Sequence, residues 1–158
     1  MAYDKNNKLH IVTVVAVIRN AEGKYLLLKR SEREIAYPGV FTFPGGKMED
    51  NRTVDETLRQ EVKEECGLTL SEGKILLKDK SFTRPDGQTV KVFSYLCFVE
   101  TSEPVVFGTH DFTEYKWVTL DEVDSLQHVG LKTELEQAEK LLSLGVPLAE
   151  LFTRSEQA

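Results

Sequence analysis

Cysteine is scarce in this chain, whose 158 residues include only two, Cys66 and Cys97. Two thiols cannot form a disulfide framework, and these two lack the paired spacing of a zinc site. One falls on the apolar face of an expected helix and the other in an apolar strand, so we expect both to be buried and reduced. This use of cysteine is typical of a cytosolic protein.

Long hydrophobic runs are missing as well. The longest apolar stretch, residues 11–18, is too short to cross a bilayer, and residues 1–8 are polar and lack the apolar core of a signal peptide. We therefore expect a cytoplasmic protein with no membrane partner. No internal repeat, low-complexity segment or linker interrupts the sequence. Its length predicts one domain over residues 1–158, with a core at about 9–145 and a loose tail at 146–158.

Positive charge is in short supply. Lysine and arginine number 20 against 26 aspartates and glutamates, which gives a net charge of −6. This balance argues against a nucleic-acid polymer or an anionic membrane as the main partner. A small phosphorylated substrate is still compatible with it, because a bound metal ion reverses the local sign of charge.

The apolar pattern predicts a mixed sheet with helices packed on it. Residues 11–19 are apolar at both odd and even positions, which is typical of a central strand covered on both faces. We expect further strands at 25–29, 40–43, 75–83, 89–99 and 115–119, with a hairpin loop at 84–88. A short helix or turn is expected at 120–126. An amphipathic helix follows from Leu131 to Leu142, and Gly145 and Pro147 end it.

One helix can be placed from its ends. Thr53 followed by Glu56 is a capping-box pattern, which predicts that the helix begins at Thr53. Gly67 is the expected terminating residue. The predicted buried stripe is spaced every four residues and comprises Val54, Leu58, Val62 and Cys66. Two glycines, Gly45 and Gly46, precede this helix and are expected to form a turn.

Three acidic side chains gather at the end of this helix. Glu61, Glu64 and Glu65 are spaced so that their carboxylates share one face, where like charges cost roughly 0.2–0.5 kcal/mol per pair. Two of them lie in the last turn, where the helix dipole disfavours anions. A cation above this face would reverse both effects. The pattern therefore favours a hard divalent ion with oxygen ligands.

Residues 46–68 resemble the signature of the Nudix hydrolases. That signature reads glycine, five residues, glutamate, seven residues, then Arg-Glu-apolar-any-Glu-Glu-any-Gly-apolar; the second half fits from Glu61 to Leu68, with Gly46 at the required distance. The preceding Gly-Val-Phe-Thr-Phe-Pro-Gly-Gly (39–46) and the later Trp-Val-Thr-Leu-Asp-Glu (117–122) also resemble family segments. The resemblance implies an α/β fold, an α/β/α sandwich around a mixed β-sheet.

Two positions depart from the family pattern. Arg52 stands where the family has its first glutamate, and Gln60 stands where it has arginine. In the family these two residues commonly form an ion pair that steadies the loop and the catalytic helix. Both halves of that pair are replaced here. Glu49 and Glu56 are alternative partners for Arg52.

The resemblance also implies a set of metal ligands. Glu61 and Glu65 would be the main ligands and catalytic residues, Glu64 would share the metal cluster, and the Gly45 carbonyl would add a ligand. The implied ion is Mg²⁺, with Mn²⁺ as an alternative. Which glutamate acts as general base is left open, and further candidates outside the helix are Asp111 and Glu114.

Candidates for substrate binding are Arg30 and Lys47, which could meet phosphates, and Phe43. Ordinary surface charge or core packing is the alternative for each of them. Tyr37 and Phe82 belong to a larger set of aromatic side chains that could stack on a base or simply pack in the core.

The leading functional hypothesis is a metal-dependent hydrolase of a nucleoside diphosphate linked to another group, such as a nucleoside triphosphate or ADP-ribose. The alternative is a catalytically weak nucleotide-binding or sensing module on the same fold. A third option, isomerisation of a prenyl diphosphate, has no positive feature in the sequence. Either enzyme or sensor could form a homodimer.

Overall fold

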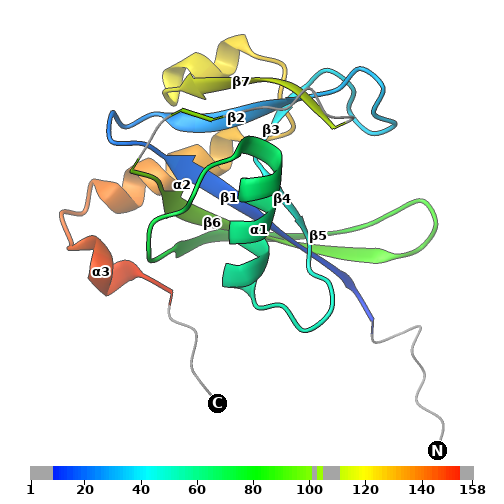
Figure 1. Cartoon of the computed structure of the whole chain (residues 1–158), viewed down its shortest axis with the longest axis horizontal. Coiled ribbons are helices and arrows are strands. Elements are labelled where there is room, and N and C mark those ends of the chain that lie inside the picture. Colours follow the sequence, from blue (N-terminus) through cyan, green and yellow to red (C-terminus); the bar gives the residue numbers. More distant parts are fainter. Residues whose placement is uncertain (1–8, 101–102, 105–110, 154–158) are drawn as a thin grey trace, which may run out of the picture.

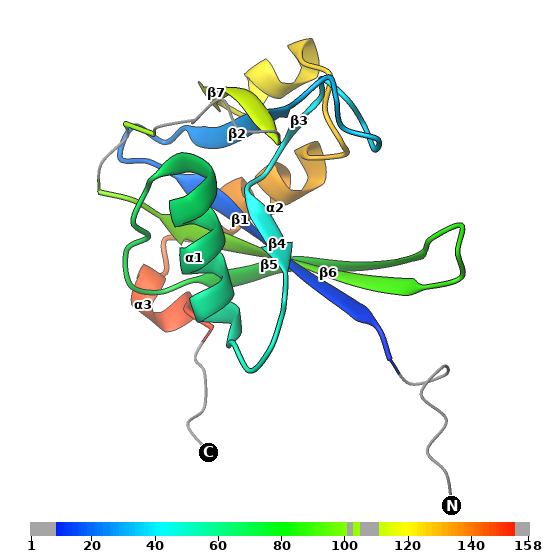
Figure 2. The same ribbon diagram turned by 45° about the vertical axis from the view of Figure 1, so that its right-hand side comes forward.

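The central element of the fold is β1 (Ile11–Arg19), which lies in the middle of a seven-stranded sheet. The computed structural model describes residues 9–100, 103–104 and 111–153. On one side β1 pairs in parallel with β6 (Thr89–Phe98), which pairs antiparallel with β5 (Ile75–Thr83). Figure 2 shows the β5–β6 hairpin extending beyond the body of the molecule beside the start of β1.

The other side of the sheet is built from shorter pairings. β2 (Tyr25–Arg30) follows β1 and lies between β3 (Phe41–Thr42) and β7 (Phe112–Val118), both antiparallel to it. β4 (Gly45–Lys47) pairs antiparallel with the first half of β1. β1 therefore has different partners at its two ends, so the sheet divides near its centre (Figure 1).

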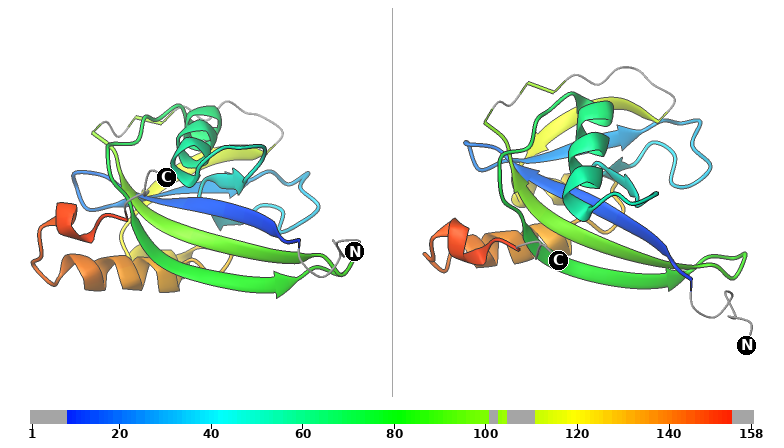
Figure 3. Two further views of the ribbon diagram at one scale, coloured as in Figure 1. Left: turned by 90° about the horizontal axis from the view of Figure 1, so that it is seen from below. Right: turned by 60° about the horizontal axis from the view of Figure 1, so that its bottom comes forward.

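Helices cover both faces of the sheet (Figure 3). α1 (Val54–Cys66) lies on one face, and α2 (Lys132–Leu142) and α3 (Leu148–Leu151) lie on the other, while the short 3₁₀ helix η2 (Asp121–Ser125) follows β7. Side chains of β1 point alternately to the two faces, so Val14 and Ala16 join the core under α1 and Val17 joins the core under α2. The predicted α/β/α sandwich is confirmed, and so is the central strand covered on both faces.

The capping box of α1 forms as predicted. The Thr53 hydroxyl accepts a hydrogen bond from the Glu56 N–H at 3.1 Å, and the Glu56 carboxylate accepts one from the Thr53 N–H at 3.0 Å. Gly67 ends the helix in the left-handed region, at φ 67°. Leu58, Val62 and Cys66 are buried under the helix, and Cys97 is buried opposite them in β6.

Removing this cap should weaken the fold without touching the core. We expect Thr53→Ala to cost about 1 kcal/mol, because it leaves helix N–H groups without an acceptor. In a domain of this size that lowers the thermal unfolding midpoint by about 2–4 °C. Thr53→Ser, which keeps the hydroxyl, should unfold at the parent temperature in the same calorimetric scan. Equal midpoints for the alanine and serine variants would contradict a stabilising role for the hydroxyl.

Some expectations are corrected by the structure. Gly45 and Gly46 do not form a turn; they form the strand β4 against β1. β7 begins at Phe112 rather than at residue 115, and the strand expected at 40–43 covers only β3. The segment after Pro147 was expected to be loose, but α3 packs against the core and the Thr153 N–H donates to the Lys74 carbonyl at 2.6 Å. Residues 154–158 lie outside the described part of the chain.

Candidate active site

The end of α1 lies directly against β4. The Glu65 carboxylate accepts a hydrogen bond from the Gly45 N–H at 2.9 Å. Glu61 lies over the next residue, because a Cβ added to Gly46 would fall 2.5 Å from the Glu61 carboxyl carbon. The two glycines therefore allow close approach rather than a turn: Gly46 leaves room for the Glu61 carboxylate, and Gly45 lets β4 lie directly against β1.

These carboxylates lie in an unfavourable place for negative charge. Burial raises the pKa of Glu65 to about 8, the Gly45 N–H opposes the shift, and the negative charges of Glu61, Asp111 and Glu64 add to it. Burial also raises the pKa of Glu61, again helped by acidic neighbours and opposed by the positive charge of Arg52. The local field therefore favours a cation.

Glu64 differs from the other two acids of the helix. It is exposed and accepts a hydrogen bond from the Gln60 amide at 2.8 Å. The two departures from the family pattern therefore act on different carboxylates: Gln60 holds Glu64, and Arg52 acts electrostatically on Glu61. Of the alternative partners for Arg52, Glu56 is used in the capping box. Within the described residues, neither Glu56 nor Glu49 forms an ion pair with Arg52.

The donor atoms fit a divalent metal ion. Glu61 and Glu65 offer carboxylate oxygens, which Mg²⁺ and Mn²⁺ prefer, and the Gly45 backbone lies beside Glu65. Across the described residues, no three His, Cys, Asp or Glu side chains already converge into a metal cage. This is compatible with Mg²⁺, which keeps several of its waters and takes few protein ligands.

A cavity of about 620 Å³ opens beside this pair of acids. Its size is typical of small-molecule sites. Both acidic and basic side chains line its wall. The lining residues come from β1, β2 and the loop after it, β3, β4, α1 and β7 or from positions next to them, and are Thr13, Val15, Arg30, Glu34, Thr42, Phe43, Gly45, Lys47, Glu65, Asp111 and Phe112.

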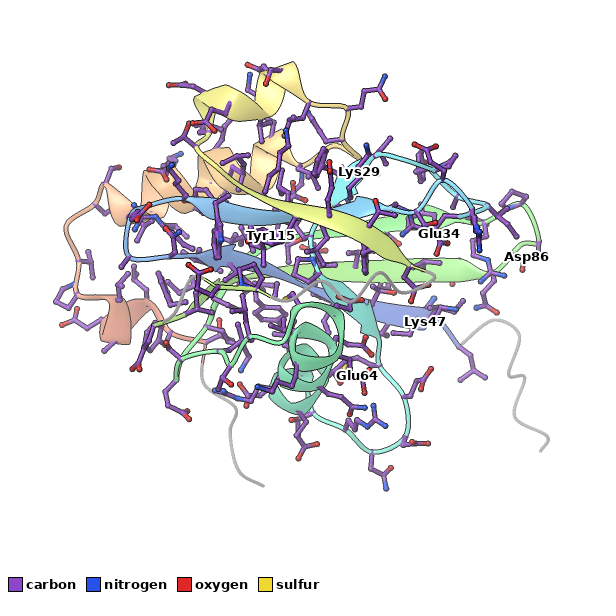
Figure 4. The ribbon with its side chains drawn as sticks, turned by 45° about the horizontal axis from the view of Figure 1, so that its top comes forward. Lys29, Glu34, Lys47, Glu64, Asp86 and Tyr115 are labelled. Carbon is purple, nitrogen blue, oxygen red and sulfur yellow. The ribbon has the colours of Figure 1, made fainter. Side chains whose placement is uncertain are left out.

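The structure brings most of the sequence candidates to this cavity. Arg30, Lys47, Phe43 and Asp111 all line it together with Glu65. Figure 4 shows Lys47 on β4 and Glu64 on α1, with Glu34 on the loop after β2.

Two basic residues of β2 have acidic partners. The Arg30 guanidinium donates to the Glu34 carboxylate at 3.1 Å and to the Ala36 carbonyl at 2.9 Å, which fixes its position in the cavity wall. Glu114 does not line the cavity; it lies opposite Lys29 on the neighbouring strand and pairs with it at 3.8 Å. Glu114 is therefore not a residue of the cavity, whereas Glu34, which the sequence did not single out, is one.

Sequence reasoning also missed Glu134, a buried acid on the sheet-facing side of α2. The signal was present, because Glu134 occupies a position on the apolar stripe between Leu131 and Leu135. No sequence pattern of this kind singles out Thr13 and Thr42. They reach the cavity only through the pairing of strands that are distant in sequence.

Comparison with known proteins identifies the family and agrees with the fold. Residues 9–141 match the family model of the NUDIX domain. The chain is 32% identical to the nucleoside triphosphatase NudI of Enterobacter sp. (strain 638) over 124 residues, which cover 72% of this chain and 86% of that protein. The chain therefore belongs to the Nudix hydrolase family.

Solved structures share the same fold. The MutT NUDIX hydrolase from Burkholderia pseudomallei matches at a TM-score of 0.69 and 25% identity, over 82% of this chain and 98% of that one. The NUDIX domain of Shewanella oneidensis NrtR, solved in complex with ADP ribose, matches at a TM-score of 0.71 and 19% identity, over 89% of this chain and 94% of that one. The fold resemblance predicted from the sequence is confirmed.

Proposed function

We propose that this protein hydrolyses a pyrophosphate bond of nucleoside triphosphates in a reaction that depends on Mg²⁺, with Mn²⁺ as an alternative ion. The observation that carries the proposal is the cavity, which is lined by a half-buried acid, Glu65, and by two basic side chains, Arg30 and Lys47. A triphosphate needs both kinds of group: cationic contacts for its oxygens and carboxylates for its metal ion. The relationship to NudI, named as a nucleoside triphosphatase, supports this substrate class.

The proposal assigns roles to the main charged residues of the site. Glu61 and Glu65, with the Gly45 backbone, would hold the ion, and Glu64 would reach it when released from Gln60. The bound ion would stabilise charge on the phosphoryl oxygens and lower the pKa of a water molecule. Lys47 and Arg30 orient the phosphates. We assign Asp111 as the candidate to accept the proton of the attacking water, since it lines the cavity outside the acidic helix.

A substrate panel tests the proposal. Purified protein with Mg²⁺ should cleave at least one nucleoside triphosphate to a monophosphate and pyrophosphate, or to a diphosphate and phosphate, as resolved by anion-exchange chromatography. Chelation of the ion should reduce the rate by at least 100-fold, and added Mg²⁺ or Mn²⁺ should restore it. The panel should include ADP-ribose, dinucleoside polyphosphates and nucleotide sugars, which would widen the assignment to other linked nucleotides.

The sensor hypothesis makes the opposite prediction for the same panel. Tight nucleotide binding with no turnover on any member, in Mg²⁺ or Mn²⁺, would replace the hydrolase proposal with a binding module. The proposal also includes a cytoplasmic location and a small phosphorylated substrate as the main partner, without a nucleic-acid polymer or membrane. No helix among the described residues is long and apolar enough to cross a membrane. A homodimer stays a prediction.

A further inference from the structure

A second cavity, of about 420 Å³, adjoins the active-site cavity on the face of the sheet covered by α2. The two cavities share part of their walls: Thr13, Val15, Thr42 and Phe43 line both. The second cavity is mainly apolar, and no part of the hydrolytic chemistry proposed above uses it. A ligand that extends along the shared wall would occupy both cavities.

The strand register connects the two cavities directly. Lys47 on β4 is paired with Thr13 on β1, Thr13 with Val92 on β6, and Val92 with Lys80 on β5. Paired residues point to the same face, so these four form one row across the sheet. At about 4.8 Å per strand the row spans roughly 14 Å, from the phosphate end at Lys47 to Lys80 in the second cavity.

A buried carboxylate lies in the wall of this otherwise apolar cavity. Glu134 of α2 is 2% exposed. Its Oε2 accepts a hydrogen bond from the Thr133 hydroxyl at 2.8 Å, and its Oε1 lies 3.9 Å from the Lys80 Nζ, an ion pair too long for a hydrogen bond. A carboxylate can accept about four hydrogen bonds, so Glu134 retains acceptor capacity directed into the cavity.

A buried carboxylate such as that of Glu134 destabilises a protein core unless it is compensated. A charged side chain at a fully buried position needs hydrogen bonds or an ion pair to offset its lost hydration, and Glu134 has only the one hydrogen bond from Thr133 and the long ion pair with Lys80. At the mouth of the same cavity, two aromatic side chains stand in solvent: Phe82 is 50% exposed and Tyr37 is 63% exposed. Apolar walls, exposed aromatic rings and one unsaturated acceptor are the features of a site for a flat heterocycle with N–H donors.

We propose that the second cavity binds the nucleobase of the substrate and that Glu134 makes it selective for guanine. This inference rests on the proposed nucleotide substrate and specifies its base. Guanine presents an N1–H and an exocyclic amino group side by side, which match the two oxygens of a carboxylate, and its neighbouring O6 accepts from a cation such as Lys80. Glu134 and Lys80 are therefore specificity-determining residues.

The other bases fit this pair less well. Uracil and thymine place carbonyl oxygens on both sides of a single N–H, so a carboxylate would face their negative ends. Adenine and cytosine offer an amino group beside an unprotonated ring nitrogen, which again meets Glu134 with a lone pair. Selectivity arises from these repulsions as well as from the matched hydrogen bonds.

A comparison of GTP with ITP tests the role of Glu134, because the two differ only in the exocyclic amino group of the base. The wild-type protein should favour GTP by about 10-fold or more in kcat/KM, the usual effect of one hydrogen bond to a charged group. Glu134→Gln should reduce kcat/KM for GTP by at least 10-fold and bring the GTP-to-ITP ratio close to one. The matched control is Glu136→Gln, an exposed position on the same helix, which should keep the wild-type ratio.

Lys80→Met provides a variant that should fold even if the core does not tolerate a change at Glu134, because Lys80 is nearly half exposed. It should lower kcat/KM several-fold for GTP and ITP alike, since both carry the O6 acceptor. The value of kcat/KM for UTP should stay unchanged. A wild-type ratio of GTP to ITP near one, or a Glu134→Gln variant that keeps the wild-type ratio, would overturn the proposal.

Binding measurements separate this inference from the proposed hydrolysis. Calorimetric titration with GMP and with IMP needs no turnover, and the wild-type protein should bind GMP more tightly while Glu134→Gln binds both alike. If GMP is preferred in this way but no triphosphate is cleaved, the base site stands and the hydrolase proposal fails. If triphosphates are cleaved with equal rates and the two monophosphates bind alike, the hydrolase stands and the base site is wrong.

Discussion

Replacing Glu65 with glutamine is expected to abolish turnover and, at the same time, to make the metal-free protein more stable. The side chain is half-buried beside other acids, which raises its pKa to about 8. Its charged form is therefore destabilising when no cation is present. Glutamine keeps an oxygen for the Gly45 N–H, which the carboxylate now accepts at 2.9 Å, and removes the charge. Activity should fall by at least 100-fold, because the substitution removes a proposed metal ligand.

The pH dependence follows from the direction of the pKa shift. A carboxyl group whose pKa is raised on folding contributes its full stability below the unfolded value of 4.5 and loses it as the pH rises through about 8. The glutamine variant has no such loss. Its advantage in the free energy of unfolding should therefore grow between these two pH values and then level off. Each kcal/mol raises the thermal midpoint by about 2–4 °C.

Metal ions should reverse the order of the thermal midpoints of the wild type and Glu65→Gln. Thermal unfolding with a chelator at pH 8.5 should show Glu65→Gln above the wild type, whereas saturating Mg²⁺ should raise the wild-type midpoint and leave the variant nearly unchanged. Glu22→Gln, an exposed carboxyl group in the turn after β1, serves as the control and should follow the wild type in both scans and in activity. Equal gains from Mg²⁺ in wild type and variant would show that Glu65 is not a ligand.

Glu61→Gln should lose activity to a similar extent but gain less stability. Burial raises the pKa of Glu61, but the charge of Arg52 acts against that shift, so its ionised form is less costly in the metal-free protein. The comparison of the two variants separates the metal-binding role that they share from the electrostatic cost that falls mainly on Glu65.

Local patterns predicted α1 well. Its capping box, its terminating glycine and its buried stripe depend on residues no more than a few positions apart, and each of these features is present in the structure. The long strands could be predicted for a related reason. β1, β5 and β6 are continuous runs whose pattern of apolar side chains shows directly which faces are covered.

The features that the sequence did not predict depend on pairing between distant segments. Gly45 and Gly46 carry no side chains that would show a strand pattern, so the sequence predicts a turn where the register with β1 forms a strand. α3 is short, and only its packing beside β5 and β6 distinguishes it from a loose tail. The second cavity could not be predicted at all, since its wall combines β1 with β5, β6 and α2.

The two glycines of β4 should respond in opposite ways to alanine. A Cβ at Gly45 would fall 2.3 Å from the Val14 carbonyl oxygen, a backbone atom of the central strand that cannot move aside. We expect Gly45→Ala to destabilise the fold by about 3 kcal/mol, the upper part of the usual range for overpacking. The three heavy atoms nearest to a Cβ at Gly46 all belong to the Glu61 carboxyl group, which can rotate away on its flexible side chain.

Gly46→Ala should therefore keep the fold and lose the activity. Its unfolding midpoint should stay within a few degrees of the wild type, because alanine is at least as favourable as glycine in a strand. A displacement of the Glu61 carboxylate by about 1 Å is enough to cost roughly 100-fold in rate. Thermal unfolding followed by circular dichroism, together with kcat/KM, should be measured on both variants to separate the loss of fold from the loss of activity. An active Gly46→Ala variant would mean that Glu61 can leave its position above β4 without harm to catalysis, and that this carboxylate is not needed to hold the ion.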